Sequence, residues 1–107
     1  MIDWLRVKEL REEVGEEDFD EVVELFLEEV EGVIGKLRTG DRSALEQDLH
    51  LLKGSAMNLG VDDFSALCLK GERDSAAGAA ASVDLDAVFV SYEQSKAEFL
   101  AKLPALA

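Results

Sequence analysis

The sequence predicts an all-α fold: an up-down antiparallel four-helix bundle with an additional N-terminal capping helix. Apolar residues recur at steps of three and four along five segments of the chain, which is the period of an amphipathic helix. No period-two apolar alternation is sustained, and no Asn-Gly or Asp-Gly hairpin turn is present. The short connections at Thr39-Gly40 and Gly60-Val61 predict that neighbouring helices run antiparallel.

The chain of 107 residues is expected to form a single domain over residues 1–107, because this length suits one hydrophobic core. Hydrophobic residues make up 48% of the chain and charged residues 33%, which is typical of a folded, soluble protein. No internal repeat or linker is visible in the sequence. The expected helices span residues 3–14, 18–38, 42–59, 63–77 and 84–103.

The first two expected helices have recognisable start and stop signals. Asp3 is a good N-cap for the first helix, and Gly15 stops it. Asp18 and Glu21 form a capping box at the start of the second helix, which ends at Thr39-Gly40. The apolar stripe of this second helix consists of Phe19, Val22, Val23, Phe26, Leu27, Val30, Val33, Ile34 and Leu37.

Two glycines, Gly32 and Gly35, lie in the second half of that long helix. Each weakens a helix by about 1 kcal/mol relative to alanine. Either they allow close packing against a neighbour, or this end of the helix tolerates them.

The third expected helix follows Asp41 and ends at Gly60. Its apolar residues alternate steps of four and three, which is typical of the seam of a helical bundle. These seam residues are Leu45, Leu49, Leu52, Ala56 and Leu59. His50, the only histidine, lies about 100° round the helix from Leu49, so we expect it at the edge of the seam, within reach of solvent.

The last two expected helices are bounded by polar residues and a proline. Asp62 or Asp63 caps the fourth helix, which contains Phe64, Leu67 and Cys68. The fifth helix starts at Val83 or Asp84 and runs towards Leu103, before Pro104 stops it.

The charge balance excludes several classes of partner. Eleven Lys and Arg against 24 Asp and Glu give a formal net charge of −13, which opposes binding to nucleic acid or to anionic membrane surfaces. The single Cys68 cannot form an internal disulfide, no secretory signal is visible, and no apolar run is long enough to span a bilayer. We therefore expect a cytoplasmic protein.

The stretch around His50 carries the chemistry. A neutral imidazole is a competent nucleophile at physiological pH, and phosphoryl transfer depends mainly on positioning and charge neutralisation. Lys53 and Gly54 lie one turn beyond His50 on the same helix face. Lys53 is placed to hold the oxygens of a phosphoryl group on Nε2, and Gly54 leaves clearance for the active site of a partner.

These residues resemble a known signature. The pattern His50-x-Leu52-Lys53-Gly54-Ser55, followed by Leu59-Gly60, Leu67-Cys68 and Glu72, is similar to that of histidine-containing phosphotransfer (Hpt) domains of multistep two-component signalling. The similarity covers nearly the whole chain. It departs from the family at Met57-Asn58, where small residues are common.

The resemblance implies a phosphorelay intermediate. His50 would accept a phosphoryl group from the aspartyl phosphate of one receiver domain, on a hybrid histidine kinase or a response regulator, and pass it to the aspartate of another. Lys53 carries over as the phosphoryl stabiliser and Gly54 as the clearance residue. Members of the family have no kinase activity of their own, so no cofactor is expected on this chain. The magnesium ion would belong to the receiver domain.

Several supporting residues follow from the same reasoning. A phosphohistidine needs an acceptor that holds Nδ1 in one tautomer, and the candidates are Glu46, one turn before His50, and Glu72, which is favoured. Ser55 is expected to be a small seam residue. The predicted docking surface lies on the second and third helices, with Gln47, Leu51, Met57 and Leu25 as contacts. The protein is expected to act as a monomer.

Other interpretations stay open. The chain could be a receiver-binding regulatory module that carries no phosphoryl group, although such a module has no need of an intact nucleophile. It could also be the phosphoacceptor domain of a chemotaxis-type kinase whose catalytic part is a separate polypeptide. A zinc site is disfavoured, because one His and one Cys are a poor ligand set.

Overall fold

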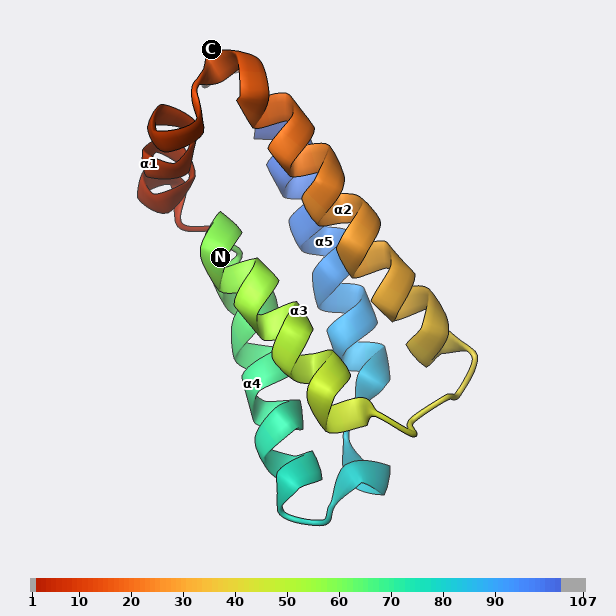
Figure 1. Ribbon diagram of the computed structural model, residues 1–107. Helices are drawn as coiled ribbons and strands as arrows, with labels where there is room; N and C mark the ends of the chain where they lie inside the picture. Colours follow the sequence, from red (N-terminus) through yellow and green to blue (C-terminus); the bar gives the residue numbers. More distant parts are fainter. Residues whose placement is uncertain (1, 103–107) are drawn as a thin grey trace.

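The computed structural model describes residues 2–102, and its regular structure is helical. In chain order the elements are α1 (Trp4–Val14), α2 (Glu16–Arg38), α3 (Leu45–Leu59), α4 (Asp62–Ala76), the short 3-10 helix η1 (Ala80–Ser82) and α5 (Leu85–Lys102). Figure 1 shows α2, α3, α4 and α5 side by side, with α1 beside the end of α3. The predicted all-α bundle is confirmed. The only extended pairing among residues 2–102 is an isolated bridge between Ile2 and Val61.

The predicted seam of the third helix is confirmed. All five of its members are buried in the core, where they pack with apolar residues from the other helices. The most extensive contact between two helices is that of α3 with α4, and Gly71 of α4 lies within it. A Cβ at that position would lie 2.8 Å from Leu49 Cδ1, so a side chain there would push the two helices apart.

Two predicted helix starts are wrong, and each has a local cause. The second helix begins at Glu16 after Gly15, whose φ of +88° turns the chain directly out of α1, so Asp18 lies inside the first turn and no side chain caps the helix. The third helix begins at Leu45 because Asp41 Oδ1 accepts hydrogen bonds from the backbone N–H and the hydroxyl of Ser43, at 3.0 and 2.6 Å. This local turn replaces the expected first helical turn.

The remaining ends are close to those expected. Asp3 caps α1 by accepting a hydrogen bond from the N–H of Arg6, and Gly60 ends α3 in the left-handed conformation at φ +85°. The predicted cap of the fourth helix is wrong: Asp62 and Asp63 lie inside its first turn, and Val61, which precedes them, provides no side-chain cap. Asp84 accepts a hydrogen bond from the N–H of Ala87 at the start of α5. The predicted stop at Leu103 and Pro104 lies outside the described residues.

The two glycines of α2 do not support close packing. A Cβ at Gly32 or Gly35 would meet nothing within 4 Å in the described chain, and the helix continues past both to Arg38. The helix therefore tolerates them. No helix between residues 2 and 102 is long and apolar enough to cross a membrane.

Candidate functional site

His50 lies on α3 with its ring directed away from the core. Its side chain is 67% exposed, whereas Leu49 beside it is fully buried in the seam. The helical phase thus leaves the imidazole open to an approaching molecule.

Glu72, on α4, holds the inner nitrogen of this ring. Its Oε1 lies 2.8 Å from His50 Nδ1, and its side chain is only 19% exposed. Of the two predicted acceptors the structure thus pairs His50 with Glu72, while Glu46 is exposed in the first turn of α3. A carboxylate accepts hydrogen bonds, so this contact assigns the proton to Nδ1 and leaves the lone pair on Nε2.

Lys53 lies on the Nδ1 side of the ring. Its Nζ is 3.1 Å from Glu72 Oε2 and 3.4 Å from His50 Nδ1. Glu72 Oε2 is buried and has no well-directed hydrogen bond from any described residue, so its contact with Lys53 is an ion pair. The ammonium group therefore neutralises Glu72 in this state.

The surroundings of Glu72 keep its carboxyl group ionised. The hydrogen bond from His50 lowers the pKa of Glu72 below its usual value, partial burial opposes that shift, and Lys53 lowers the pKa further. A negative carboxylate at Nδ1 stabilises positive charge that develops on the ring when Nε2 attacks an electrophile.

Gly54 leaves bare backbone one turn from His50. It is exposed, and a Cβ built at this position would meet nothing within 4 Å in the described chain. The internal packing therefore does not require a glycine here. The free space lies on the side from which a partner would approach the ring.

A scan against protein-family models matches residues 21–103 to the Hpt domain. The chain belongs to the Hpt-domain family. No significant match was found among curated proteins or among solved structures. The match covers most of α2 and all of α3, α4 and α5, and it leaves α1 outside. Hpt domains carry out histidine phosphotransfer in phosphorelays and typically exchange phosphoryl groups with receiver domains.

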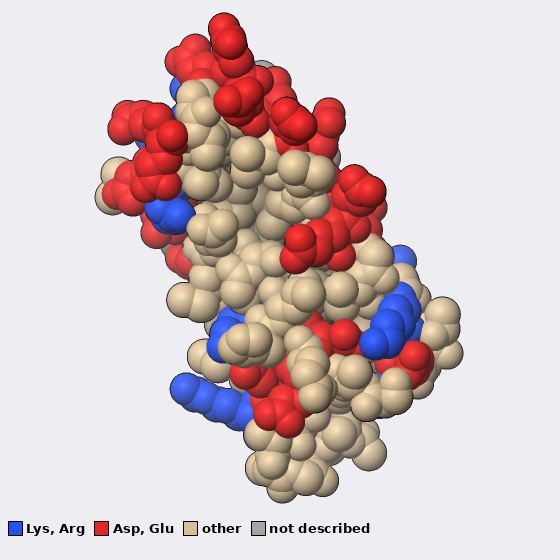
Figure 2. All heavy atoms as spheres, in the orientation of Figure 1, with Lys and Arg blue, Asp and Glu red and all other residues tan. Residues whose placement is uncertain are grey.

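The predicted docking residues of this Hpt domain are all exposed. Leu25, Leu51 and Met57 are 58%, 38% and 61% exposed, and Gln47 is exposed one turn before Leu51. Figure 2 shows the face formed by α2 and α3 as a largely uncharged band, with acidic groups clustered towards the α1 end and along α2. The side chain of Ser55 lies at the α2–α3 boundary, where its hydroxyl donates to Glu29 Oε1 at 3.3 Å.

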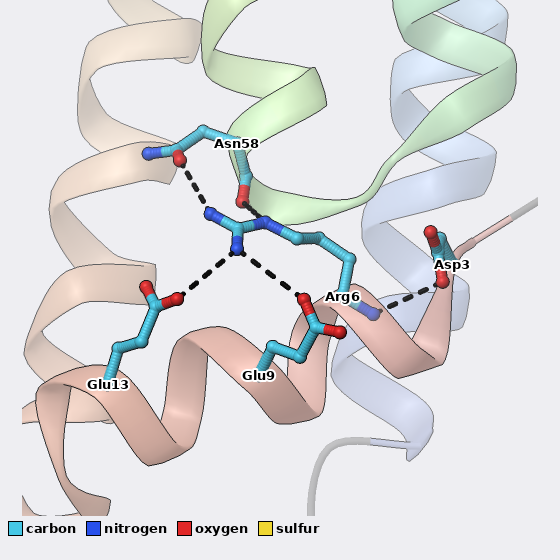
Figure 3. Close-up of polar contacts among 5 residues, drawn as sticks. All are labelled: Asp3, Arg6, Glu9, Glu13 and Asn58. Atoms are coloured by element: carbon cyan, nitrogen blue, oxygen red, sulfur yellow. Dashed lines mark hydrogen bonds and ion pairs between the residues drawn. The ribbon is translucent and has the colours of Figure 1, made fainter.

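Two polar contacts near the site were not anticipated from the sequence. Lys36 of α2 donates to Asp48 of α3 at 2.9 Å, two residues before His50. In Figure 3, Arg6 of α1 reaches across to Asn58 and donates to its backbone oxygen and to its Oδ1, both at 3.0 Å. Asn58, at the departure from the family pattern, therefore ties the capping helix to the end of α3. No local spacing indicates either pair, because each joins different helices.

The thiol of Cys68 is shielded from solvent and is not reactive. Cys68 is fully buried, and burial raises the pKa of its thiol to about 12. Within residues 2–102 there is no group of three or more His, Cys, Asp or Glu side chains that could hold a metal ion.

Proposed function

We propose that this Hpt domain is a phosphorelay intermediate in which His50 receives a phosphoryl group from the aspartyl phosphate of one receiver domain and gives it to the aspartate of another. The observation that carries the proposal is the exposed ring whose Nδ1 is held 2.8 Å from Glu72. This arrangement presents the lone pair of Nε2 outward.

The step is an in-line displacement. Nε2 of His50 forms a bond to phosphorus while the acyl O–P bond of the aspartyl phosphate breaks, and the receiver carboxylate leaves. The ring keeps its proton on Nδ1, and Glu72 balances the positive charge that the ring acquires. Transfer to the second receiver reverses these events.

Lys53 and Gly54 have supporting roles in this proposal. Lys53 leaves Glu72 to contact the phosphoryl oxygens, and Gly54 admits the receiver to the ring. The predicted contacts Gln47, Leu51, Met57 and Leu25 form the docking surface. The magnesium ion belongs to the receiver domain, and the Hpt domain acts as a cytoplasmic monomer without a cofactor of its own.

Phosphotransfer profiling tests the proposal. The purified chain is incubated with a panel of receiver domains that have been phosphorylated with acetyl phosphate, and His50→Gln is the blank. We expect the wild-type protein to gain an acid-labile phosphoryl group and the variant to gain none. Equal labelling of both proteins would contradict the assignment of His50.

A second incubation distinguishes the phosphorelay intermediate from the phosphoacceptor domain of a chemotaxis-type kinase. The chain is mixed with a histidine kinase core and ATP, with and without a receiver domain. We expect labelling only when a receiver is present. Labelling without a receiver would show direct phosphorylation by a kinase instead.

A further inference from the structure

Glu29 is an exposed carboxylate on α2 that faces α3 next to the His50 stretch. The hydroxyl of Ser55 donates to its Oε1 at 3.3 Å, which holds the carboxylate over the boundary between the two helices. Ser55 directly follows Gly54 and lies about 7.5 Å along α3 from His50. Gly54, Ser55 and Glu29 line one shallow hollow, so a partner that docks over Gly54 on this side meets Glu29.

The surface around Glu29 combines apolar side chains and bare backbone with a few polar neighbours, among them Glu28 on α2 and Asn58 on α3. Leu25, one turn earlier on α2, and Met57 on α3 are both more than half exposed, and Gly32 and Gly54 add no side chains. A hollow of about 180 Å³ opens here, lined by Leu25, Phe26 and Leu59 among others, with Glu29 and Ser55 at its polar part. Exposed apolar side chains thus lie beside a hollow, and Glu29 places a negative charge at its edge, with Glu28 next to it on α2.

Glu29 has no cationic partner in the described part of the chain. Other carboxylates that bridge these helices have a cationic partner: Asp48 pairs with Lys36, Glu72 with Lys53, Glu31 with Lys96 and Glu93 with Arg38. Arg6 shares a shallow hollow with Glu29, but its guanidinium is engaged by Asn58, Glu9 and Glu13. The charge of Glu29 therefore remains available to a docking partner.

Burial of an unpaired carboxylate at an interface is strongly unfavourable, whereas a cation placed opposite the carboxylate offsets the free-energy cost of desolvation. The same arrangement disfavours partners that present an acidic or apolar group there. We propose that Glu29 selects among receiver domains by requiring a lysine or arginine on the docking face opposite it. This inference rests on the proposed phosphorelay function and adds the chemistry of the partner surface.

The experiment uses the full chain and the receiver domain to which the wild-type protein transfers fastest in the panel. Rates of transfer are measured as a function of receiver concentration for wild type, Glu29→Gln and Glu29→Lys. The matched controls are Asp86→Asn and Asp86→Lys, which make the same changes of net charge at an exposed position on α5. In Figure 1, α5 lies behind α2 and α3.

We expect Glu29→Gln to lower kcat/KM about tenfold, mainly through KM, and Glu29→Lys to lower it further, because both remove the interfacial ion pair. The Asp86 variants should match the wild-type protein. Replacing the exposed Lys and Arg residues of that receiver with Glu, one at a time, should identify one receiver variant that restores transfer from Glu29→Lys.

Two results would overturn the inference alone: Glu29 variants that behave like the Asp86 controls with every receiver in the panel, or a failure of every receiver variant to restore transfer. In both cases the wild-type chain still transfers and His50→Gln does not, so the proposed function stands. If the wild-type chain accepts no phosphoryl group from any receiver, the proposed function fails and this inference fails with it.

Discussion

Two carboxylates in this Hpt domain, Glu72 and Glu31, each contact the ring side chain of one residue and the ammonium group of a lysine. The ring beside Glu72 is exposed, whereas the ring beside Glu31 is buried. Glu72 lies 2.8 Å from His50 Nδ1 and 3.1 Å from Lys53 Nζ. Glu31 Oε2 lies 2.7 Å from both the hydroxyl of Tyr92 and the Nζ of Lys96. The His50 side chain is 67% exposed, whereas Tyr92 is 2% exposed.

The two centres share a hydrogen-bonding pattern but differ in the chemistry of the ring and in its exposure. Burial and the Glu31 carboxylate both raise the pKa of the Tyr92 hydroxyl above its usual value, so that the phenol stays protonated and serves as a donor that links α5 to α2. His50 keeps its outer nitrogen in solvent, where a receiver domain can reach it.

The largest expected contrast follows from removing each carboxylate. Glu72→Ala leaves Nδ1 without an acceptor, and we expect phosphoryl transfer to fall about 10- to 100-fold, as for other residues that orient a functional histidine. Glu31→Ala should leave transfer within about twofold, since it acts on the buried ring. Assays in which transfer from a phosphorylated receiver is quenched at set times measure the rates of both variants.

Glu72→Gln is the matched control for that contrast, because the amide oxygen still accepts from Nδ1. It should lose less activity than Glu72→Ala. His50 is the only histidine, so its ¹⁵N NMR signals report the tautomer without interference. A wild-type tautomer in Glu72→Ala would contradict the positioning role.

The open space beside His50 predicts that a small side chain at Gly54 stabilises the protein, whereas a large one slows phosphoryl transfer. Gly54→Ala should raise the free energy of unfolding by about 0.5–1 kcal/mol, because alanine favours the helix and the added Cβ meets no atom. Gly54→Gln should slow transfer about tenfold or more by obstructing the receiver, equivalent to about 1.4 kcal/mol. Urea unfolding and transfer assays measure the two effects.

Gly35→Ala is the control for this substitution. Gly35 is also exposed in a helix with nothing near its Cβ position, and it lies one turn from Glu31 and Arg38, which bind α5. It should gain similar stability with unchanged transfer. Gly35→Gln is the matched control for the transfer effect of Gly54→Gln, and loss of transfer in Gly35→Gln would show that clearance at Gly54 is not the cause.

The buried ring predicts a smaller effect that is confined to stability. Tyr92→Phe removes the donor to Glu31 and should lower the free energy of unfolding by about 1 kcal/mol, with phosphoryl transfer unchanged. Denaturant unfolding monitored by circular dichroism measures the first and the receiver assay the second. A matching loss of transfer would mean that the two carboxylate centres are coupled.

The smallest expected effect is on the pH dependence of the free energy of unfolding, to which Glu31 and Glu72 both contribute. Their ion pairs and hydrogen bonds lower the pKa of both Glu31 and Glu72 below 4.5 in the folded state. The stability they contribute is therefore complete above about pH 4.5 and is lost as the pH falls through the folded-state values. In unfolding experiments from pH 7 to pH 3, the differences between wild type and Glu31→Gln or Glu72→Gln should narrow below pH 4.5.

Most of the fold was predictable because helices are encoded by local periodicity. The seam residues from Leu45 to Leu59 are buried as their spacing indicated, and Asp3 and Gly60 cap helices as expected. The errors fall at helix starts such as Asp41, where a side chain forms a local turn with its neighbours. Such competition is decided by small free-energy differences that a pattern does not reveal.

Local spacing predicted the part of the site that lies on one helix, whereas Glu72 on α4 was favoured as the acceptor for Nδ1 through the family resemblance. The spacing of His50, Lys53 and Gly54 placed them on one face of α3. It did not indicate that Lys53 would pair with Glu72 on the Nδ1 side, nor that Glu29 would receive the hydroxyl of Ser55.

The sequence by itself determined the helices, the buried seam and the exposure of His50, because each depends on residues three and four positions apart. Only the tertiary structure decided which carboxylate holds Nδ1, where Lys53 lies and which charge stands beside the approach to the ring. These contacts depend on the register and distance between helices. The close approach of α3 to α4 at Gly71 brings the adjacent Glu72 to His50, and no local pattern encodes it.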